Sequence, residues 1–81
     1  MTVTVKLFAA AKDLAGVDSL EVNSKSGVTV AVLRRLLAEQ MPVLAGLLAR
    51  SAIAVNHDFA EETVVVNEGD EVAVIPPVSG G

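Results

Sequence analysis

Residues 28–40, VTVAVLRRLLAEQ, decide the fold, because they describe one amphipathic helix together with its start. Thr29 suits an N-cap, with Val28 before it and Leu33 four residues after it, the spacing of a hydrophobic staple. The apolar stripe of this helix comprises Val30, Leu33, Leu36 and Leu37. The side chains expected to face water are Arg34, Arg35, Glu39 and Gln40. Pro42 ends or bends the helix, and residues 43–49 predict a short further helical piece.

Two strands are predicted before this helix. Residues 2–8 alternate, with Val3, Val5 and Leu7 on one face and Phe8 on the other. Residues 19–23 alternate in the same way. A helical turn that ends at Gly16 joins the two, so the pair is expected to form a hairpin with a long connection.

Three short strands are predicted after the helix, over residues 52–55, 63–66 and 71–75. Residues 56–58 and 67–70 carry Asn, Asp and Gly in the patterns of turns. Pro76 and Pro77 cannot donate to a strand ladder, so the sheet is expected to stop there.

This order of elements predicts an α+β domain of the β-grasp (ubiquitin-like) type, a mixed sheet with one main helix packed across it. Residues 1–75 are expected to form the domain, and residues 76–81 an extended C-terminal tail that ends in Gly-Gly. Which strands pair cannot be deduced from one sequence.

Composition limits the chemistry. The chain has 81 residues, 52% of them apolar, with no Cys and one His, His57. Without Cys there is no disulfide or thiol chemistry, and one His makes a metal site unexpected. We expect no bound cofactor. No basic run suggests nucleic acid, and no apolar stretch suggests a membrane span, so a cytoplasmic protein is expected.

No catalytic constellation is expected inside the domain. Ser51, His57 and Asp58 could formally make a triad, but neighbouring His and Asp residues in a hairpin turn do not face one another readily. The side chains of the adjacent residues Glu61 and Glu62 are expected to diverge, as they do along a strand, so the two are not expected to form an acid/base dyad. His57 is therefore predicted to be a solvated turn residue, and the chain is not expected to be a self-sufficient enzyme.

The tail is the better candidate site. Gly80 and Gly81 lack Cβ atoms, so the end of the chain can enter a slot too narrow for other residues. Pro76 and Pro77 start the tail in an extended form, which reduces the entropy lost on docking. With Val78 and Ser79 they complete a segment that we expect to insert into a partner.

Residues 69–81, GDEVAVIPPVSGG, resemble the C-terminal signature of the small subunits of molybdopterin synthase, which are ubiquitin-like sulfur carriers. Residues 6–16, KLFAAAKDLAG, are similar to the N-terminal strand and turn of that family. The chain departs from the pattern at Val74 and Ile75, where the family often has two aromatics, and at His57.

The resemblance implies a reaction at Gly81. Its carboxylate would be adenylated by a ubiquitin-activator-like enzyme that uses ATP, and a sulfur donor protein would then supply the sulfur of a thiocarboxylate. The tail would insert into the large synthase subunit, in a heterotetramer, and donate sulfur to cyclic pyranopterin monophosphate. Catalytic side chains for that step belong to the large subunit.

Phe8 and Ile75 are the predicted partner interface, because both lie on the outer face of the sheet on strands expected to be neighbours. Phe59 is expected to pack under a loop. Residues 51–81 carry six carboxylates and no Lys or Arg. This charge is either a solvated acidic face or a field that steers the C-terminal half of the chain, which leads into the tail, towards a basic partner.

Two other functions fit the residues. One is a sulfur carrier for another product, such as thiazole or cysteine, or a ubiquitin-like protein modifier. The other, from a different class, is a non-catalytic β-grasp interaction module whose Gly-Gly end is incidental.

Overall fold

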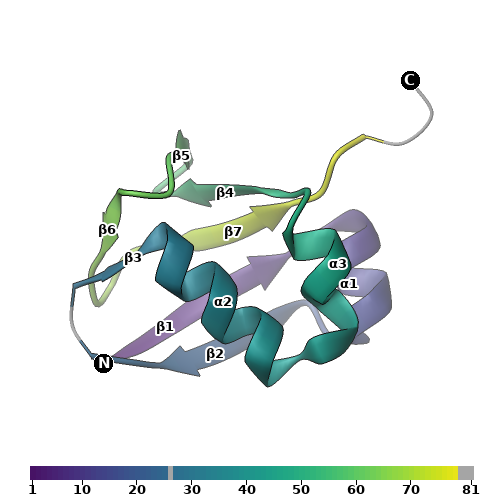
Figure 1. Ribbon diagram of the computed structural model, residues 1–81, viewed down its shortest axis with the longest axis horizontal. Coiled ribbons are helices and arrows are strands. Elements are labelled where there is room, and N and C mark those ends of the chain that lie inside the picture. Colours follow the sequence, from purple (N-terminus) through teal and green to yellow (C-terminus); the bar gives the residue numbers. More distant parts are fainter. Residues whose placement is uncertain (26, 79–81) are drawn as a thin grey trace.

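The computed structural model describes residues 1–25 and 27–78. Its elements, in chain order (Figure 1), are β1 (Thr2–Leu7), α1 (Ala9–Ala15), β2 (Ser19–Asn23), β3 (Val28–Thr29), α2 (Val30–Gln40), the 3₁₀ turn η1 (Pro42–Leu44), α3 (Ala45–Leu48), β4 (Ala52–Val55), β5 (Asp58–Ala60), β6 (Val65–Val66) and β7 (Val72–Ile75). The predicted tail residues Ser79, Gly80 and Gly81 lie outside the described residues.

The main sheet is mixed and has the strand order β2-β1-β7-β4-β5. β1 and β7 pair in parallel, whereas the β1–β2, β4–β7 and β4–β5 pairs are antiparallel. Parallel pairing brings the carboxyl ends of β1 and β7 to one edge of the sheet. Phe8, which follows β1, and Pro76, which follows β7, therefore lie at that edge, where the chain leaves the sheet (Figure 1).

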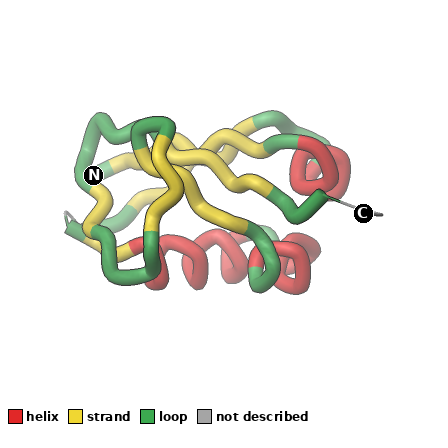
Figure 2. The backbone as a smooth tube through the Cα atoms, turned by 90° about the horizontal axis from the view of Figure 1, so that it is seen from above, coloured by secondary structure: helices red, strands yellow, loops and turns green. Residues whose placement is uncertain are grey.

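Helix α2 runs along one side of the sheet (Figure 2) and packs its apolar stripe against it. Its buried residues are Val30, Leu33 and Leu37, and the sheet contributes Val3, Val5, Leu7, Val72 and Val74. Leu36 is only partly buried. Thr29 caps the helix as predicted, since its Oγ1 accepts a hydrogen bond from the Val32 amide at 3.2 Å. The predicted α+β arrangement is confirmed.

Two strand predictions needed correction. Residues 58–60 form strand β5 rather than the end of a turn, because the loop has only two residues, Asn56 and His57, at φ 52° and 73°. Asn and His tolerate this left-handed region better than most residues, so the hairpin closes one residue earlier than expected. The strand predicted over 63–66 is limited to β6, which pairs with β3 outside the main sheet.

Arg34 does not face water as predicted. Its side chain is 20% exposed, and its Nη1 donates to the carbonyl oxygens of Leu48 and of Ser51, the latter at 2.7 Å. Nε and Nη2 donate to the two carboxylate oxygens of Glu62 at 3.0 and 2.8 Å. The helical pattern places Arg34 on the flank of α2, and the return of the chain from α3 into β4 then covers it.

Candidate functional site

The candidate site begins with a row of four residues across the outer face of the sheet, opposite α2. Strand register pairs Lys6 with Ala73, Ala73 with Ala54, and Ala54 with Phe59. The two central members are alanines. The middle of the row is therefore low, and the longer side chains around it stand higher.

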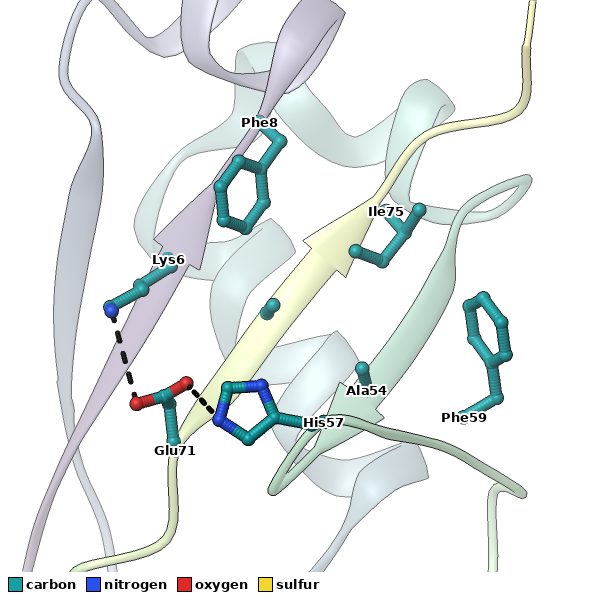
Figure 3. A pocket seen from close by; sticks show the side chains of 8 residues that line it. Lys6, Phe8, Ala54, His57, Phe59, Glu71 and Ile75 are labelled. Atoms are coloured by element: carbon teal, nitrogen blue, oxygen red, sulfur yellow. Dashed lines mark ion pairs between the residues drawn. The ribbon is translucent and has the colours of Figure 1, made fainter.

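The result is a hollow of about 370 Å³, which we call the outer hollow. Its floor is Ala54 and Ala73, and its apolar walls are Phe8, Phe59 and Ile75 (Figure 3). The structure thus places Phe8, 47% exposed, and Ile75 around one hollow, as expected for neighbouring strands. Their role as a partner interface stays a prediction. Phe59 is 76% exposed, so the expectation that it packs under a loop was wrong.

The remaining rim of the outer hollow is polar. Glu71 lies between two basic groups: Lys6 Nζ is 3.8 Å from its Oε1, and His57 Nε2 is 3.0 Å from its Oε2 (Figure 3). His57 is solvated, as predicted, with 82% of its side chain exposed, but it also lines the hollow through this contact. Its apposition to Glu71 follows from the β4–β7 pairing, which no signal in the sequence revealed.

A hydrogen-bond network holds this rim in place. The Glu71 amide donates to Asn56 Oδ1 at 2.9 Å, and Asn56 Nδ2 donates to Asp70 Oδ1 at 3.1 Å. Asp70 Oδ2 also accepts from the Asn67 amide at 2.8 Å. These two donors, the Asn67 amide first, lower the pKa of Asp70 below its ordinary value, because they stabilise the carboxylate. The β4–β5 turn is thus tied to the start of β7.

No triad forms from Ser51, His57 and Asp58. Ser51 precedes β4 and His57 follows it, so the strand separates them. Ser51 is buried, and its hydroxyl donates to the Leu47 carbonyl oxygen at 2.7 Å. Glu61 and Glu62 are not a dyad either, because Glu62 pairs with Arg34. Within residues 1–25 and 27–78, no group of three acidic or histidine side chains is placed to hold a metal ion.

The tail leaves the sheet beside the apolar end of the outer hollow. Ile75 ends β7, Pro76 is half-buried, and Val78 is 94% exposed. The strand ends where predicted, at the two prolines. Of the segment expected to insert into a partner, Pro76, Pro77 and Val78 are described, and they extend away from the domain (Figure 1).

The carboxylates that precede the tail in sequence are not beside it in space. Glu68, Asp70 and Glu71 lie before β7, and the tail leaves from the far end of that strand. Any steering by these charges therefore acts from the opposite end of the sheet. Glu62 and Glu71 also have basic partners from the first half of the chain, Arg34 and Lys6.

In the part of the chain that the structure describes, no helix is both long and apolar enough to cross a membrane.

Comparisons with known proteins agree with this architecture. The small archaeal modifier protein SAMP1 of Haloferax volcanii has a similar structure, with a TM-score of 0.88, 27% identity, and coverage of 100% of both chains. This likeness confirms the predicted ubiquitin-like β-grasp fold.

Sequence relatives carry a more specific name. The molybdopterin synthase sulfur carrier subunit of Arabidopsis thaliana is 34% identical over 79 residues, 98% of this chain and 82% of that protein. The subunit of the same name from Dictyostelium discoideum is 34% identical over 80 residues, 95% of this chain and 93% of that protein. The resemblance inferred from the two ends of the sequence is confirmed. The model of the ThiS family matches residues 5–81, and the chain belongs to that family.

Proposed function

We propose that this chain is the sulfur carrier subunit of a molybdopterin synthase and that its working group is the carboxylate of Gly81. The observation that carries the proposal is the end-to-end likeness to sulfur carrier subunits, at 34% identity over 98% of the chain. The family match also extends to Gly81 itself.

The chemistry that the proposal requires is activation of a carboxylate. A carboxylate oxygen attacks the α-phosphorus of ATP on an adenylating enzyme, pyrophosphate leaves, and an acyl adenylate forms. Hydrosulfide delivered by a donor protein then attacks the acyl carbon, AMP leaves with the bonding electrons, and a thiocarboxylate remains. The chain has no Cys, so it cannot carry the sulfur as a thiol. ATP belongs to the activating enzyme, and we propose no cofactor bound to this domain.

The proposed partner of the loaded carrier is the large synthase subunit, together with which it forms a heterotetramer in the cytoplasm. The tail would enter that subunit's active site and give its sulfur to cyclic pyranopterin monophosphate. The position of the outer hollow supports this arrangement, because Phe8 and Ile75 line it beside the point where the tail leaves the sheet, within reach of a protein that receives the tail.

A second candidate function is protein modification. It is favoured by the likeness to the modifier protein SAMP1, whose TM-score is 0.88. The two functions differ in what accepts the activated carboxyl group: a sulfur transfer returns the carrier with a free carboxylate, whereas modification joins Gly81 to an amine.

An acceptor assay separates them. The thiocarboxylated chain is incubated with the large subunit and cyclic pyranopterin monophosphate, and product pterin and protein masses are followed together. We expect a dithiolene-containing pterin and regenerated carboxylate. Lysine-linked adducts of the chain without any thiolated pterin would favour the modifier function.

A further inference from the structure

The outer hollow has two chemically different ends. Next to the tail it is apolar, with Phe8 and Ile75, and Phe59 stands along its side (Figure 3). Away from the tail it ends at the Glu71 carboxylate, against which the exposed side chains of Lys6 and His57 lie. A ligand that fills it must therefore combine an apolar body with a polar tip that suits a carboxylate.

The floor gives the hollow its depth. Ala54 is 8% exposed although it faces outward, because its neighbours stand above it. Ala73 lies beside it in register, between Lys6 and Ala54. A larger residue at either position would fill the volume, so these alanines leave room for a side chain that comes from elsewhere.

The charge at the polar end is negative. Asp58 is in register with Val55, which in turn pairs with Val72, so Asp58 lies at the same end of the sheet as Asp70 and Glu71. Lys6 contacts Glu71 only at 3.8 Å, and His57 Nε2 lies 3.0 Å from its other carboxylate oxygen, but these two partners are 52% and 82% exposed, so solvent screens both contacts. A carboxylate has about four acceptor sites, so Glu71 can accept further hydrogen bonds beside those that it makes now. The field there favours a cation.

From these features, and resting on the proposed function, we propose that the outer hollow is a socket for one arginine side chain of the large synthase subunit. The aliphatic stem of the arginine lies over Ala54 and Ala73, between Phe8 and Phe59, and its guanidinium group binds Glu71. Arginine fits better than lysine because its planar group can bind a carboxylate through two hydrogen bonds and can stack on an exposed Phe ring. Arginine is also among the residues that dominate binding energies at interfaces.

The socket is tested by measuring how the purified large subunit of the same organism binds variants of this chain, with association and dissociation rates determined separately. Ala73→Leu fills the hollow and is expected to weaken binding at least about tenfold. Glu71→Gln keeps the shape and removes the charge, and is expected to weaken binding about three- to tenfold, mainly through faster dissociation.

Matched controls exist in the chain for both changes. Ala31→Leu makes the same change in size on an exposed position of α2, on the other side of the sheet. Glu68→Gln removes the same charge from the turn before β7 without lining the hollow. Both controls should dissociate at the wild-type rate.

Several results would contradict the socket. If Ala73→Leu and Glu71→Gln both bind like the wild type, the hollow receives nothing. If only Ala73→Leu weakens binding, the occupant is apolar and the assignment to arginine is wrong. When the arginines of the large subunit are replaced one at a time, one of them must show a loss that is not additive with Glu71→Gln. The absence of any such arginine would also refute the assignment.

The proposed function is judged by a different measurement on the same samples. Wild-type chain and both variants are incubated with activating enzyme, ATP and a sulfur source, and their masses are determined. If the wild type gains sulfur while the binding results contradict the socket, only the socket fails. If it gains none, the carrier function fails regardless of the binding data.

Discussion

At the scale of single residues, Arg34 ties the main helix α2 to other parts of the chain. It donates to backbone carbonyl oxygens at the end of α3 and before β4, and to both oxygens of Glu62. The hydrogen bonds from Arg34 lower the pKa of Glu62 below its ordinary value, burial opposes them to a smaller extent, and the charge of Arg34 adds a smaller lowering still.

This pKa shift predicts how stability depends on pH. The pKa of Glu62 is lower in the folded chain than in the unfolded chain, where it is about 4.3. The stabilisation that its carboxylate gives to the fold is therefore fully present at a pH above the unfolded pKa, and it is lost as the pH falls through the folded pKa. Glu62 is half-exposed, so solvent screening limits the contribution to about 0.5–1 kcal/mol. Glu62→Gln should lower the free energy of unfolding in urea by that amount at pH 7 and by less at pH 3. An equal loss at both pH values would contradict this account.

Phe8 gives a second prediction at this scale. It is 47% exposed at the apolar end of the outer hollow, so Phe8→Ala should cost less than about 1 kcal/mol of stability, compared with about 3–5 kcal/mol for a buried Phe. Affinity for the large subunit should fall about tenfold or more. Val43→Ala, an exposed apolar position in η1, is the control for both measurements. A large fall in melting temperature with unchanged affinity would place Phe8 in the core instead.

Residue types alone predicted some side-chain environments and not others. Alternation along β1 correctly predicted that Phe8 lies on the outer face of the sheet, because the residues of one strand are enough to show which side chains share a face. The surroundings of Arg34 and Phe59 depend on which segments return beside them, and that is set by pairings such as β4 with β5 and β7. Sequence periodicity carries no information about these pairings.

At the scale of elements, the β4–β5 hairpin is strained at its two-residue loop. Asn56 and His57 both have positive φ, at 52° and 73°, a region that Gly adopts without the Cβ penalty. His57→Gly should therefore relieve this strain and raise the free energy of unfolding by about 0.5–1 kcal/mol. Little is lost in exchange, because the contact between His57 and Glu71 is largely solvated.

Asn56→Gly is the matched control for that prediction. It relieves a similar φ but removes the hydrogen bonds of Asn56 with the Glu71 amide and with Asp70, so it should destabilise the domain. Thermal unfolding of both variants measures the difference. If His57→Gly is destabilised as much as Asn56→Gly, then the side chain of His57, rather than its backbone conformation, matters for the turn.

Elements with local signals were the ones that the sequence predicted well. Helix α2 has a cap, a periodic stripe and a proline just after its end, and all three lie within one short stretch. Strand β5 has no such signal, because it exists only through its pairing with β4. The outer hollow was missed for the same reason: it is made by residues from four strands that meet only in the folded sheet.

At the scale of the whole molecule, the charges act at a distance from the tail. The net charge is −4, and the end of the sheet away from Pro76 carries Asp58, Glu68, Asp70 and Glu71. Association with a basic partner should therefore slow severalfold as salt is raised, while dissociation changes little. Neutralising Asp58 and Glu68 together should slow association at low salt. Stopped-flow association rates that stay constant from low to high salt would mean that these charges are only solvated.

The central claim is that Gly81 carries the sulfur, and intact-mass measurement tests it most directly. The chain is incubated with the activating enzyme, ATP and a sulfur source. We expect a gain of about 16 mass units, the exchange of one oxygen for sulfur at the terminal carboxylate, because sulfur replaces the hydroxyl oxygen once AMP has left. The chain without Gly81 should gain nothing while it melts at the wild-type temperature, since Pro77 and Val78, which lead to it, are exposed. An unchanged wild-type mass, or an equal gain by the shortened chain, would contradict the account.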